Sequence, residues 1–412
     1  MSGDMGRSRL PVAVVVAVAA AAAATFLLRP RGVIQPVPVD AQQYFTASQL
    51  DRAEDFRSVQ RLLGVAGIGI AIGTLAVLAW RQPRSLMARL ERRPLLGGAA
   101  AGAGISLVLI VTGLPVSAWM RSRSLDVGLA TQSWPDWAAD VVKAAGISAV
   151  TAAIGGLVAM ALVRRFPRRW WAPAALIVLV YGVVTIWLYP IVIDPIFNRF
   201  DRLPEGKLRS EVLQLADQAG VDVGQVYRVD ASRRTSAANA YVIGLGHSKR
   251  VVLYDNLIEG FSPGEVRTVV AHELGHQKHD DLLRGLAWLA IVAPAGTFLV
   301  QAVAERVGAR GRPGTRAALG TPAALPAIAL AISVVSLGLG CASNVLSREV
   351  EASADSFALR LTRDPEDFIG FQRRISVQNV GDPDPPGWYQ ALFGTHPTTM
   401  ERIGAGVAFG SK

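Results

Sequence analysis

Seven apolar stretches, each long enough to cross a lipid bilayer, constrain the fold of this chain more than any other feature. A helix that spans a bilayer needs about 20 predominantly apolar residues. Lipid offers no partners for backbone N–H and C=O groups, so a spanning segment must satisfy them internally, as a helix does. The pattern therefore predicts a mainly α-helical membrane protein with seven spans, near residues 11–28, 63–80, 96–118, 145–163, 172–193, 285–305 and 322–345.

The charged residues agree with a membrane protein. They make up 18% of the chain, below the roughly 25% that is usual for soluble domains. The net charge of +10 comes almost entirely from arginine, because lysine occurs only five times. Many arginines lie between apolar stretches, where they set membrane topology, so we expect the lipid bilayer as a partner and no nucleic acid. The arginine-rich, lysine-poor composition also suggests a GC-rich bacterium, and hence a bacterial cell membrane.

The first apolar stretch has a second interpretation. Arg7 and Arg9 precede an Ala/Val core, as in a secretory signal peptide. No clear small-x-small cleavage site followed by a polar mature start lies near Arg29. We therefore expect a retained span.

Two polar regions interrupt the apolar pattern. Residues 194–284 follow the fifth span, and residues 346–412 follow the seventh. Because the two spans within residues 285–345 would form an antiparallel hairpin, both polar regions emerge on the same side of the membrane. We expect an amino-terminal membrane domain of five spans in residues 1–193, followed by one small α+β domain assembled from the two polar pieces.

The first polar region carries clear element signals. Its expected elements are a helix near 206–220 and strands near 225–230, 239–244 and 250–254. A further helix begins at Ser262, which is a good N-cap, and Glu265 completes a capping box. Pro263 suits the first turn of that helix. We expect the helix to continue through residue 284 and to run with little break into the sixth span.

The strongest chemical signal is His272-Glu-Leu-Gly-His276. Residues four apart lie on one face of a helix, so both imidazoles can reach one metal ion. Glu273 is rotated by about 100° from His272 and would lie beside the metal. A carboxylate there can take a proton from the attacking water and pass it to the leaving amine. The competing interpretation is a pair of solvated helix histidines, but the independent capping signal favours a zinc site.

A catalytic zinc site needs a third protein ligand and one open position. Cys341, the only cysteine, lies in an apolar span and is a poor candidate. Glu351 and Asp355 follow the seventh span and are four residues apart, so one can bind metal while the other accepts a hydrogen bond from a ligand imidazole. Glu349 is also available. The other histidines are His247, His279 and His396; His279 is interpreted as solvated or as lying behind a ligand.

A fixed order of short motifs runs from about residue 189 to residue 402. After His272-Glu-x-x-His276 and two spans comes Ser347-Arg-x-x-Glu351-x-x-Ala-Asp355. The other motifs are Tyr189-Pro190 through Asn198, Leu203-Pro-x-Gly206, Ser236-x-x-Asn239-Ala-Tyr241, Arg250-Val-Val-Leu-Tyr254 and His396-Pro-x-x-x-x-Arg402. Together they resemble the type I CaaX prenyl endopeptidase family, which are seven-span membrane gluzincins related to the bacterial HtpX proteases. The amino-terminal half matches mainly in span number.

The resemblance implies roles for individual residues. The third zinc ligand in that family is the glutamate of the Glu-x-x-Ala-Asp run, here Glu351, and the aspartate, here Asp355, lies behind a ligand. His396 would face the metal and stabilise the oxyanion. We expect Arg402 to make a charge-assisted hydrogen bond that holds the structure. The implied cofactor is one Zn²⁺ per chain.

The resemblance also points to a substrate edge. A strand with one free side can bind a peptide through main-chain pairing. Asn239 and Ala240 lie in the strand that would do so, although an ordinary core strand is the alternative.

The function that these residues predict is a zinc-dependent integral-membrane endopeptidase with Glu273 as general base. Its partner would be a peptide or protein substrate near the membrane, and membrane-protein quality control is a plausible bacterial role. One alternative is CaaX-type processing of lipidated peptides. An alternative of another class is a non-catalytic zinc-binding scaffold or sensor, which would have no use for Glu273. A site-2 protease would carry its metal motif inside a span, and a transporter would carry ionisable residues along its spans.

Arginines in short loops predict how the chain is oriented in the membrane. One side of the membrane would carry the amino terminus and three loops with Arg81, Arg84, Arg89, Arg92, Arg93, Arg164, Arg165, Arg168, Arg169, Arg306, Arg310, Arg312 and Arg316. Two loops near 29–62 and 119–144, on the other side, carry eight basic residues. The positive-inside rule places the richer side in the cytoplasm, so we expect an extracytoplasmic catalytic domain. Eukaryotic members of the resembled family work on the cytosolic face, which is the opposite expectation.

Overall fold

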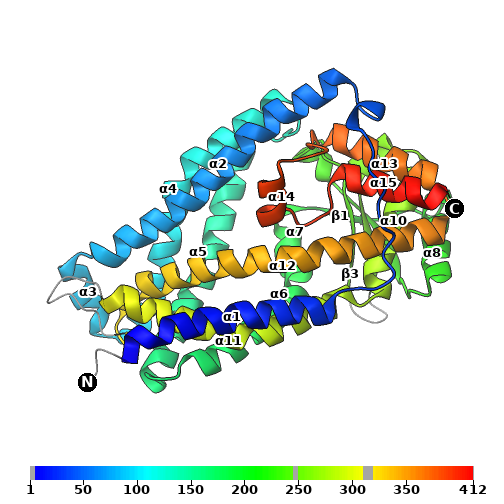
Figure 1. Ribbon diagram of the computed structural model, residues 1–412. Helices are drawn as coiled ribbons and strands as arrows, with labels where there is room; N and C mark the ends of the chain where they lie inside the picture. Colours follow the sequence, from blue (N-terminus) through cyan, green and yellow to red (C-terminus); the bar gives the residue numbers. More distant parts are fainter. Residues whose placement is uncertain (1–4, 245–248, 310–318, 412) are drawn as a thin grey trace.

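The computed structural model describes residues 5–244, 249–309 and 319–411, so His247, Arg310, Arg312 and Arg316 lie outside the described residues. Figure 1 shows long helices on one side and a small mixed domain on the other. The α-helices are α1 (Met5–Leu28), α2 (Ala47–Trp80), α3 (Arg84–Glu91), α4 (Pro94–Asp126), α5 (Trp134–Arg165), α6 (Trp171–Leu188), α7 (Asp194–Phe197), α8 (Lys207–Ala219), α9 (Asp255–Gly260), α10 (Pro263–Lys278), α11 (Asp281–Ala309), α12 (Leu325–Thr362), α13 (Pro365–Gln378), α14 (Gly387–Phe393) and α15 (Thr399–Gly410).

Short elements complete the chain. The strands are β1 (Phe200–Arg202), β2 (Gln225–Val229), β3 (Ala240–Ile243) and β4 (Arg250–Tyr254). The 3₁₀ turns are η1 (Ala41–Gln43), η3 (Ala231–Arg233) and η5 (Pro322–Ala324), and η2 (Tyr189–Ile193) is a π-helical turn.

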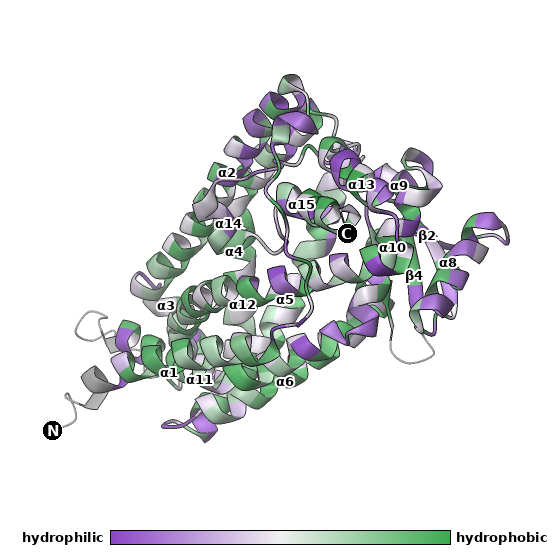
Figure 2. Ribbon diagram, turned by 45° about the vertical axis from the view of Figure 1, so that its right-hand side comes forward, coloured by the Kyte–Doolittle hydropathy of each residue, from purple (hydrophilic) through white to green (hydrophobic). Residues whose placement is uncertain are grey.

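Within the part of the chain that the structure describes, seven helices are long and apolar enough to cross a membrane, which confirms the predicted number of spans. They are built around α1, α2, α4, α5, α6, α11 and α12. Two of them exceed the length that a bilayer requires, since α2 has 34 residues and α12 has 38, against about 20 for a span. Figure 2 shows hydrophobic colouring along α1, α6 and α11 and hydrophilic colouring around α8, α9 and α13. The long helix α12 therefore carries its carboxyl-terminal turns out of the apolar layer and into the polar domain.

The helices α4 and α5 form a tight hairpin. A Cβ added at Gly98 would meet Met160, one added at Gly102 would meet the Ala152 carbonyl, and one at Gly156 would meet the Gly98 carbonyl. Small residues spaced four apart let two membrane helices approach closely. The hairpin therefore presents its connecting loop, residues 127–133, from a closely packed base.

A mixed four-stranded sheet has the order β1-β2-β4-β3. The parallel pair is β2 with β4, whereas β1 and β3 each pair antiparallel with their neighbours. The three predicted strands occur within about two residues of their expected bounds. The short edge strand β1 was not predicted. At the other edge, β3 has no strand partner on its outer side among the described residues, and its residues Ala240 and Val242 are buried towards the core.

Helix α10 begins as its sequence predicts. Ser262 accepts a hydrogen bond from the Glu265 backbone, and the Glu265 side chain accepts one from the Ser262 backbone, so the capping box is complete. The expected continuation through residue 284 is wrong. Asp280 has a φ of +51°, and a new helix begins at Asp281. A left-handed residue cannot continue a right-handed helix, and aspartate tolerates that conformation better than most residues.

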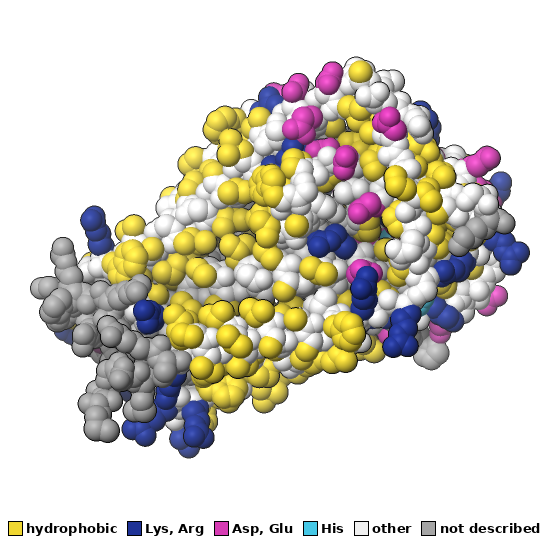
Figure 3. All heavy atoms as spheres, viewed as in Figure 1, with side chains coloured by type: hydrophobic (Ala, Val, Ile, Leu, Met, Phe, Trp, Pro, Cys, Tyr) yellow, Lys and Arg dark blue, Asp and Glu magenta, His cyan; other side chains and the backbone are white. Residues whose placement is uncertain are grey.

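The polar domain has one core made from both halves of the sequence. Val251 and Val270 pack with Leu359 and Phe368, all of them fully buried. The segment after α1 also joins it, because the Ile34 backbone donates to Ser356 Oγ at 2.8 Å. In Figure 3 hydrophobic side chains cover the long helices, and Lys and Arg side chains lie at both ends of the molecule.

Candidate active site

Two helices bring together three side chains that could hold a metal ion. His272 and His276 lie on one face of α10, with their Nε2 atoms 3.2 Å apart. Glu351 arrives from α12, with carboxylate oxygens 3.2 Å from His272 Nε2 and 3.6 Å from His276 Nε2. The ligand atoms of this trio all lie within 4.8 Å of one another.

A carboxylate holds the far side of each imidazole. His272 Nδ1 is 2.8 Å from Asp355, and His276 Nδ1 is 2.9 Å from Asp281. A carboxylate accepts hydrogen bonds, so each Nδ1 is assigned as the protonated nitrogen. Both Nε2 atoms then present lone pairs towards the same point. Two facing lone pairs at 3.2 Å repel each other unless a cation lies between them.

The donor set fits zinc. Two imidazole nitrogens and a carboxylate are a common catalytic zinc set with the fourth position open. Bonds of about 2.0–2.2 Å in a tetrahedron separate neighbouring ligand atoms by about 3.4 Å, and the separations here are 3.2–3.6 Å. Glu351 Oε2 is buried without a hydrogen-bond partner among the described residues. An orphaned buried carboxylate oxygen is costly unless something positive reaches it.

The carboxylates around His272 also favour a positive charge at this place. Burial opposes the charged imidazolium, but the nearby carboxylates of Asp355 and Glu351 outweigh burial and raise the pKa of His272 to about 10. These carboxylates would stabilise a metal cation as well as a proton. Glu273, next in the chain, has a raised pKa because it is buried, although the two histidines oppose that shift. A base of raised pKa beside a metal is suited to accepting a proton near neutral pH.

His396 faces the open side of the trio. Its Nε2 is 3.3 Å from Glu351 Oε2, and its side chain is 56% exposed. Thr395 Oγ1 is 2.9 Å from His396 Nδ1. Arg348 donates to the carbonyls of Gln390 and Gly394 and so holds the loop that carries this histidine. Burial lowers the pKa of His396, which keeps the ring neutral at neutral pH.

Arg402 lies behind the trio. Its guanidinium donates twice to Asp355, which is almost fully buried. Burial opposes the charged guanidinium, but the field of Asp355 outweighs it and raises the pKa of Arg402. Asp355 therefore contacts Arg402 and His272 simultaneously.

At the strand edge near the site, backbone groups point away from the sheet. Tyr254 N donates to Asn239 O at 3.1 Å. Hydrogen-bonded and non-hydrogen-bonded pairs alternate along antiparallel strands, so the backbones of Ala240 and Val242 point away from β4. Gln277, one residue after His276, donates to Val242 O at 3.3 Å. The edge therefore runs beside the helix that carries both imidazoles.

The remaining candidates lie elsewhere. Glu349 pairs with Arg29 at 2.6 Å. His279, the C-cap of α10, lies near Ser353 Oγ and packs against Phe357.

Asp281 was not predicted as a partner of His276. It reaches back to His276 only because the chain turns at Asp280, and a continuous helix would have carried it away. The pair Asp280-Asp281, directly after the metal motif, was the available signal. Arg348 was part of a quoted motif, but its support of the His396 loop was not predicted, and Thr395 was not noticed, since nothing local marks a residue that supports a distant loop.

Comparisons with known proteins show the family of the chain. Residues 202–406 match Peptidase family M48. Residues 37–199 match the family described as CAAX prenyl protease N-terminal, five membrane helices. The metalloprotease YhfN of Bacillus subtilis is 32% identical over 305 residues, which are 73% of this chain and 70% of the relative. The chain belongs to Peptidase family M48.

Other relatives of this M48 protein are eukaryotic. A CAAX prenyl protease 1 homolog of Oryza sativa is 33% identical over 228 residues, which are 54% of this chain and 52% of the relative. The chain thus spans about half the length of that protein. The crystal structure of S. mikatae Ste24p covers 97% of this chain and 99% of its own, with a TM-score of 0.70 and 18% identity. That likeness shows the fold. The M48 membership makes this chain a membrane metalloprotease.

Proposed function

We propose that this M48 protein is a zinc-dependent endopeptidase that cuts peptide bonds close to the membrane, with zinc held by His272, His276 and Glu351. The observation that carries the proposal is the facing pair of Nε2 atoms 3.2 Å apart. Asp355 and Asp281 fix both rings so that these lone pairs converge. A buried oxygen of Glu351 completes the donor set.

The chain's own residues supply the other steps. Zinc, when bound, polarises the scissile carbonyl and acidifies a water molecule. Glu273 accepts a proton from the attacking water and delivers it to the leaving amine. His396, neutral and half-exposed on the open side, donates a hydrogen bond to the oxygen that gains negative charge. Asp355 and Arg402 hold His272 in the orientation that catalysis requires.

The substrate backbone binds along β3. Ala240 and Val242 offer outward backbone groups, so an extended peptide can pair with them as an added strand. Asn239 is exposed at the start of this edge. Its side chain already accepts a hydrogen bond from the Ala240 N–H at 2.9 Å. An incoming peptide would replace that contact, which is local and easily exchanged.

Membrane-associated proteins are the substrate class that we favour. The α12 helix carries Glu351 shortly after the apolar run near 322–345, so the cut is made close to the bilayer surface. Quality control of bacterial membrane proteins fits this position. CaaX-type processing is the second candidate, because the named relatives include CAAX prenyl proteases. A scaffold that only binds zinc would leave the half-buried Glu273 beside the metal without a role.

The orientation rests on the arginine loops. Residues Arg81–Arg93 and Arg164–Arg169 lie at the ends of spans opposite to the catalytic domain. By the positive-inside rule this end is cytoplasmic and the catalytic domain is outside the cytoplasm.

The decisive experiment compares the wild-type protein with Glu273→Gln in detergent and in vesicles. The amide preserves shape but cannot act as a base, so zinc content and melting temperature should stay unchanged while cleavage of an internally quenched peptide is lost. Glu259→Gln, at an exposed ion pair with Arg228, is the matched control and should cleave normally. Zinc-loaded wild-type protein without peptidase activity on any peptide would support the scaffold alternative.

A second experiment tests whether the substrate must be lipidated. Farnesylated and unmodified versions of one peptide are offered to the active protein. Equal cleavage supports general proteolysis near the membrane. Strong preference for the farnesylated peptide would favour CaaX-type processing. Mass spectrometry of membrane proteins trapped by Glu273→Gln identifies natural substrates.

A further inference from the structure

The loop between the third and fourth spans pairs with the polar domain. Residues 127–133 join α4 to α5, and Ala130 forms an isolated antiparallel bridge with Thr235. Thr131 N donates to Arg234 O at 3.1 Å, and Ser236 N donates to Leu129 O at 3.0 Å. The segment that receives these bonds, residues 231–239, leads directly into β3. We call it the pre-edge segment.

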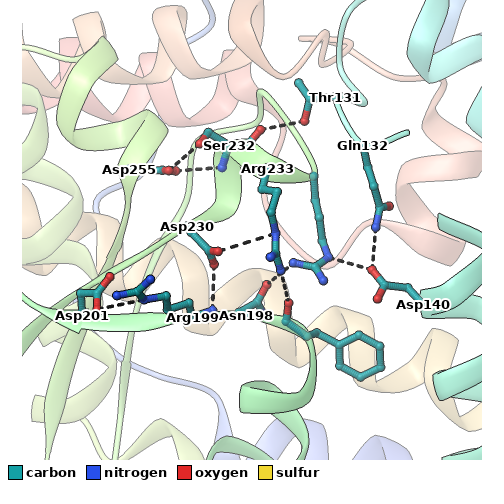
Figure 4. A network of polar contacts seen from close by, with 12 residues as sticks. Thr131, Gln132, Asp140, Asn198, Arg199, Asp201, Asp230, Ser232, Arg233 and Asp255 are labelled. Carbon is teal, nitrogen blue, oxygen red and sulfur yellow. Dashed lines mark hydrogen bonds and ion pairs between the residues drawn. The ribbon is translucent and has the colours of Figure 1, made fainter. Parts of the chain in front are cut away.

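Side chains reinforce this pairing. Thr131 Oγ1 donates to Ser232 O at 2.8 Å, and Ser236 Oγ donates to Gly128 O at 2.9 Å. Gly128 has a φ of +72°, which favours glycine at this turn. Ser232 is also held from its other side, because its N–H and hydroxyl both donate to Asp255 (Figure 4).

An ion pair closes the interface. Arg234 Nε donates to Asp140 on α5 at 2.9 Å, and both side chains are largely buried. Gln132 donates to the same Asp140 oxygen at 2.6 Å (Figure 4). Arg234 also reaches Asn198, after α7, at 3.4 Å. Charge-assisted hydrogen bonds in a partly buried place are stronger than ordinary surface contacts.

The loop itself is anchored in the membrane helices. Arg121 of α4 is buried, donates to the Gln132 and Ser133 carbonyls, and lies over the Trp134 ring. Arg52 of α2 donates to Val127 O at 2.7 Å. The loop is therefore held in place by α2 and α4. Because the loop pairs with the pre-edge segment, the position of these helices also sets the position of that segment.

The pre-edge segment is also fixed downstream. Asn379 exchanges two hydrogen bonds with the Ala238 backbone, and Asn256 donates to the Thr235 and Ala237 carbonyls. Asn379 O itself accepts from Arg57 of α2 at 2.6 Å. These contacts orient the backbone immediately before Asn239, where the substrate edge begins.

We propose that Asp140 is a positioning residue for substrate binding, which acts through Arg234 to set the place of the β3 edge relative to the metal. This inference rests on the proposed function, because it assigns the edge to the substrate. Asp140 touches neither the metal trio nor the β3 edge among the described contacts, so its effect falls on peptide affinity and not on the chemical step.

The test is Asp140→Asn in the full-length, zinc-loaded protein in detergent, with a quenched peptide as the probe. The amide keeps the shape but loses the charge that Arg234 contacts. KM should rise by roughly tenfold, as expected for a charge-assisted hydrogen bond, while kcat and zinc content stay within about twofold of the parent. Asp136→Asn is the matched control, since Asp136 lies one turn earlier on α5 and its described contacts are with Ser133.

A disulfide between the loop and the pre-edge segment tests whether fixing their positions restores the KM of Asp140→Asn. Ala130 and Thr235 form a non-hydrogen-bonded antiparallel pair, whose Cα atoms lie about 4.5 Å apart, within the range for a disulfide. In a Cys341→Ala background, Ala130→Cys with Thr235→Cys is combined with Asp140→Asn. Oxidation should restore the parent KM, and reduction of the same sample should raise it again. If Asp140 contributed only to overall stability, its replacement would change the melting temperature. The KM would then not depend reversibly on oxidation of the disulfide.

The two hypotheses fail differently. A parent protein that cleaves the peptide, together with an Asp140→Asn variant of unchanged KM, overturns the positioning role alone. A variant that loses kcat and zinc together also overturns it, because that result places Asp140 in general folding. A parent that binds zinc and does not cleave overturns the proposed function, and this inference with it.

Discussion

Arg402 and Asp355 form a two-pronged ion pair in which Nε donates to Oδ2 at 2.8 Å and Nη2 to Oδ1 at 2.6 Å. The Asp355 side chain is only 4% exposed, so the pair is almost free of solvent screening. Asp355 also holds Nδ1 of His272 at 2.8 Å. The last helix of the chain thereby sets the orientation of a residue near the middle of the sequence.

Removing Arg402 should weaken zinc binding. In Arg402→Ala the buried Asp355 loses its countercharge and no longer fixes His272, and losing such a partner costs roughly 10–100-fold in metal affinity. Competition with a chelator of known affinity measures the change. Arg374→Ala, which removes another arginine–carboxylate pair, with Glu265, serves as control. Equal zinc affinity in both variants would contradict the role given to Arg402.

Glu351 and Glu349 provide a matched pair. Glu351→Ala should lose stoichiometric zinc, since a carboxylate ligand disappears. Glu349→Ala should keep it, because Glu349 pairs with Arg29. Elemental analysis of the two purified proteins decides the matter. Full zinc content in Glu351→Ala would reassign the third ligand.

His396 should act on rate and not on metal. His396→Ala removes a hydrogen-bond donor from the open side of the site, and kcat should fall by roughly 10²–10³-fold with zinc content preserved. His279→Ala, which changes a histidine packed against Phe357, should have a much smaller effect. A His396→Ala enzyme as fast as the parent would return this histidine to a packing role.

The orientation is tested by a fused reporter. A reporter active only in the cytoplasm, joined after Lys412, should stay silent, and one active only outside the cytoplasm should give signal. Reporters after Arg93, in the arginine-rich loop, should show the reverse pattern. Strong cytoplasmic signal after Lys412 would overturn the proposed placement of the catalytic domain.

Much of this architecture follows from local sequence patterns. Spans are visible because lipid demands long apolar helices, and the start of α10 is visible because Ser262 and Glu265 satisfy each other's backbones locally. The spacing of His272 and His276 likewise needs only one helix. Glu351 was chosen over Glu349 and Asp355 by resemblance, since three acidic residues on one helix look equivalent until a second helix faces them.

Other features depend on contacts between distant segments. The end of α10 at Asp280 lacks a glycine or proline, so nothing in the local pattern marks it. The strand β1 has three residues, two of them charged, and exists only because β2 offers it an edge. In the sequence, residues 127–133 look like an ordinary connection between spans. Their pairing with Thr235 depends on tertiary packing.

The division of the site between α10 and α12 has a consequence for how the enzyme is made. A ribosome delivers His272, Glu273 and His276 first, then the sixth and seventh spans, and only afterwards Glu351 and Asp355. His396 and Arg402 emerge last of all. A nascent chain therefore carries Glu273 and two imidazoles before the other residues of the proposed site exist. The proposed site is complete only once α15 has docked.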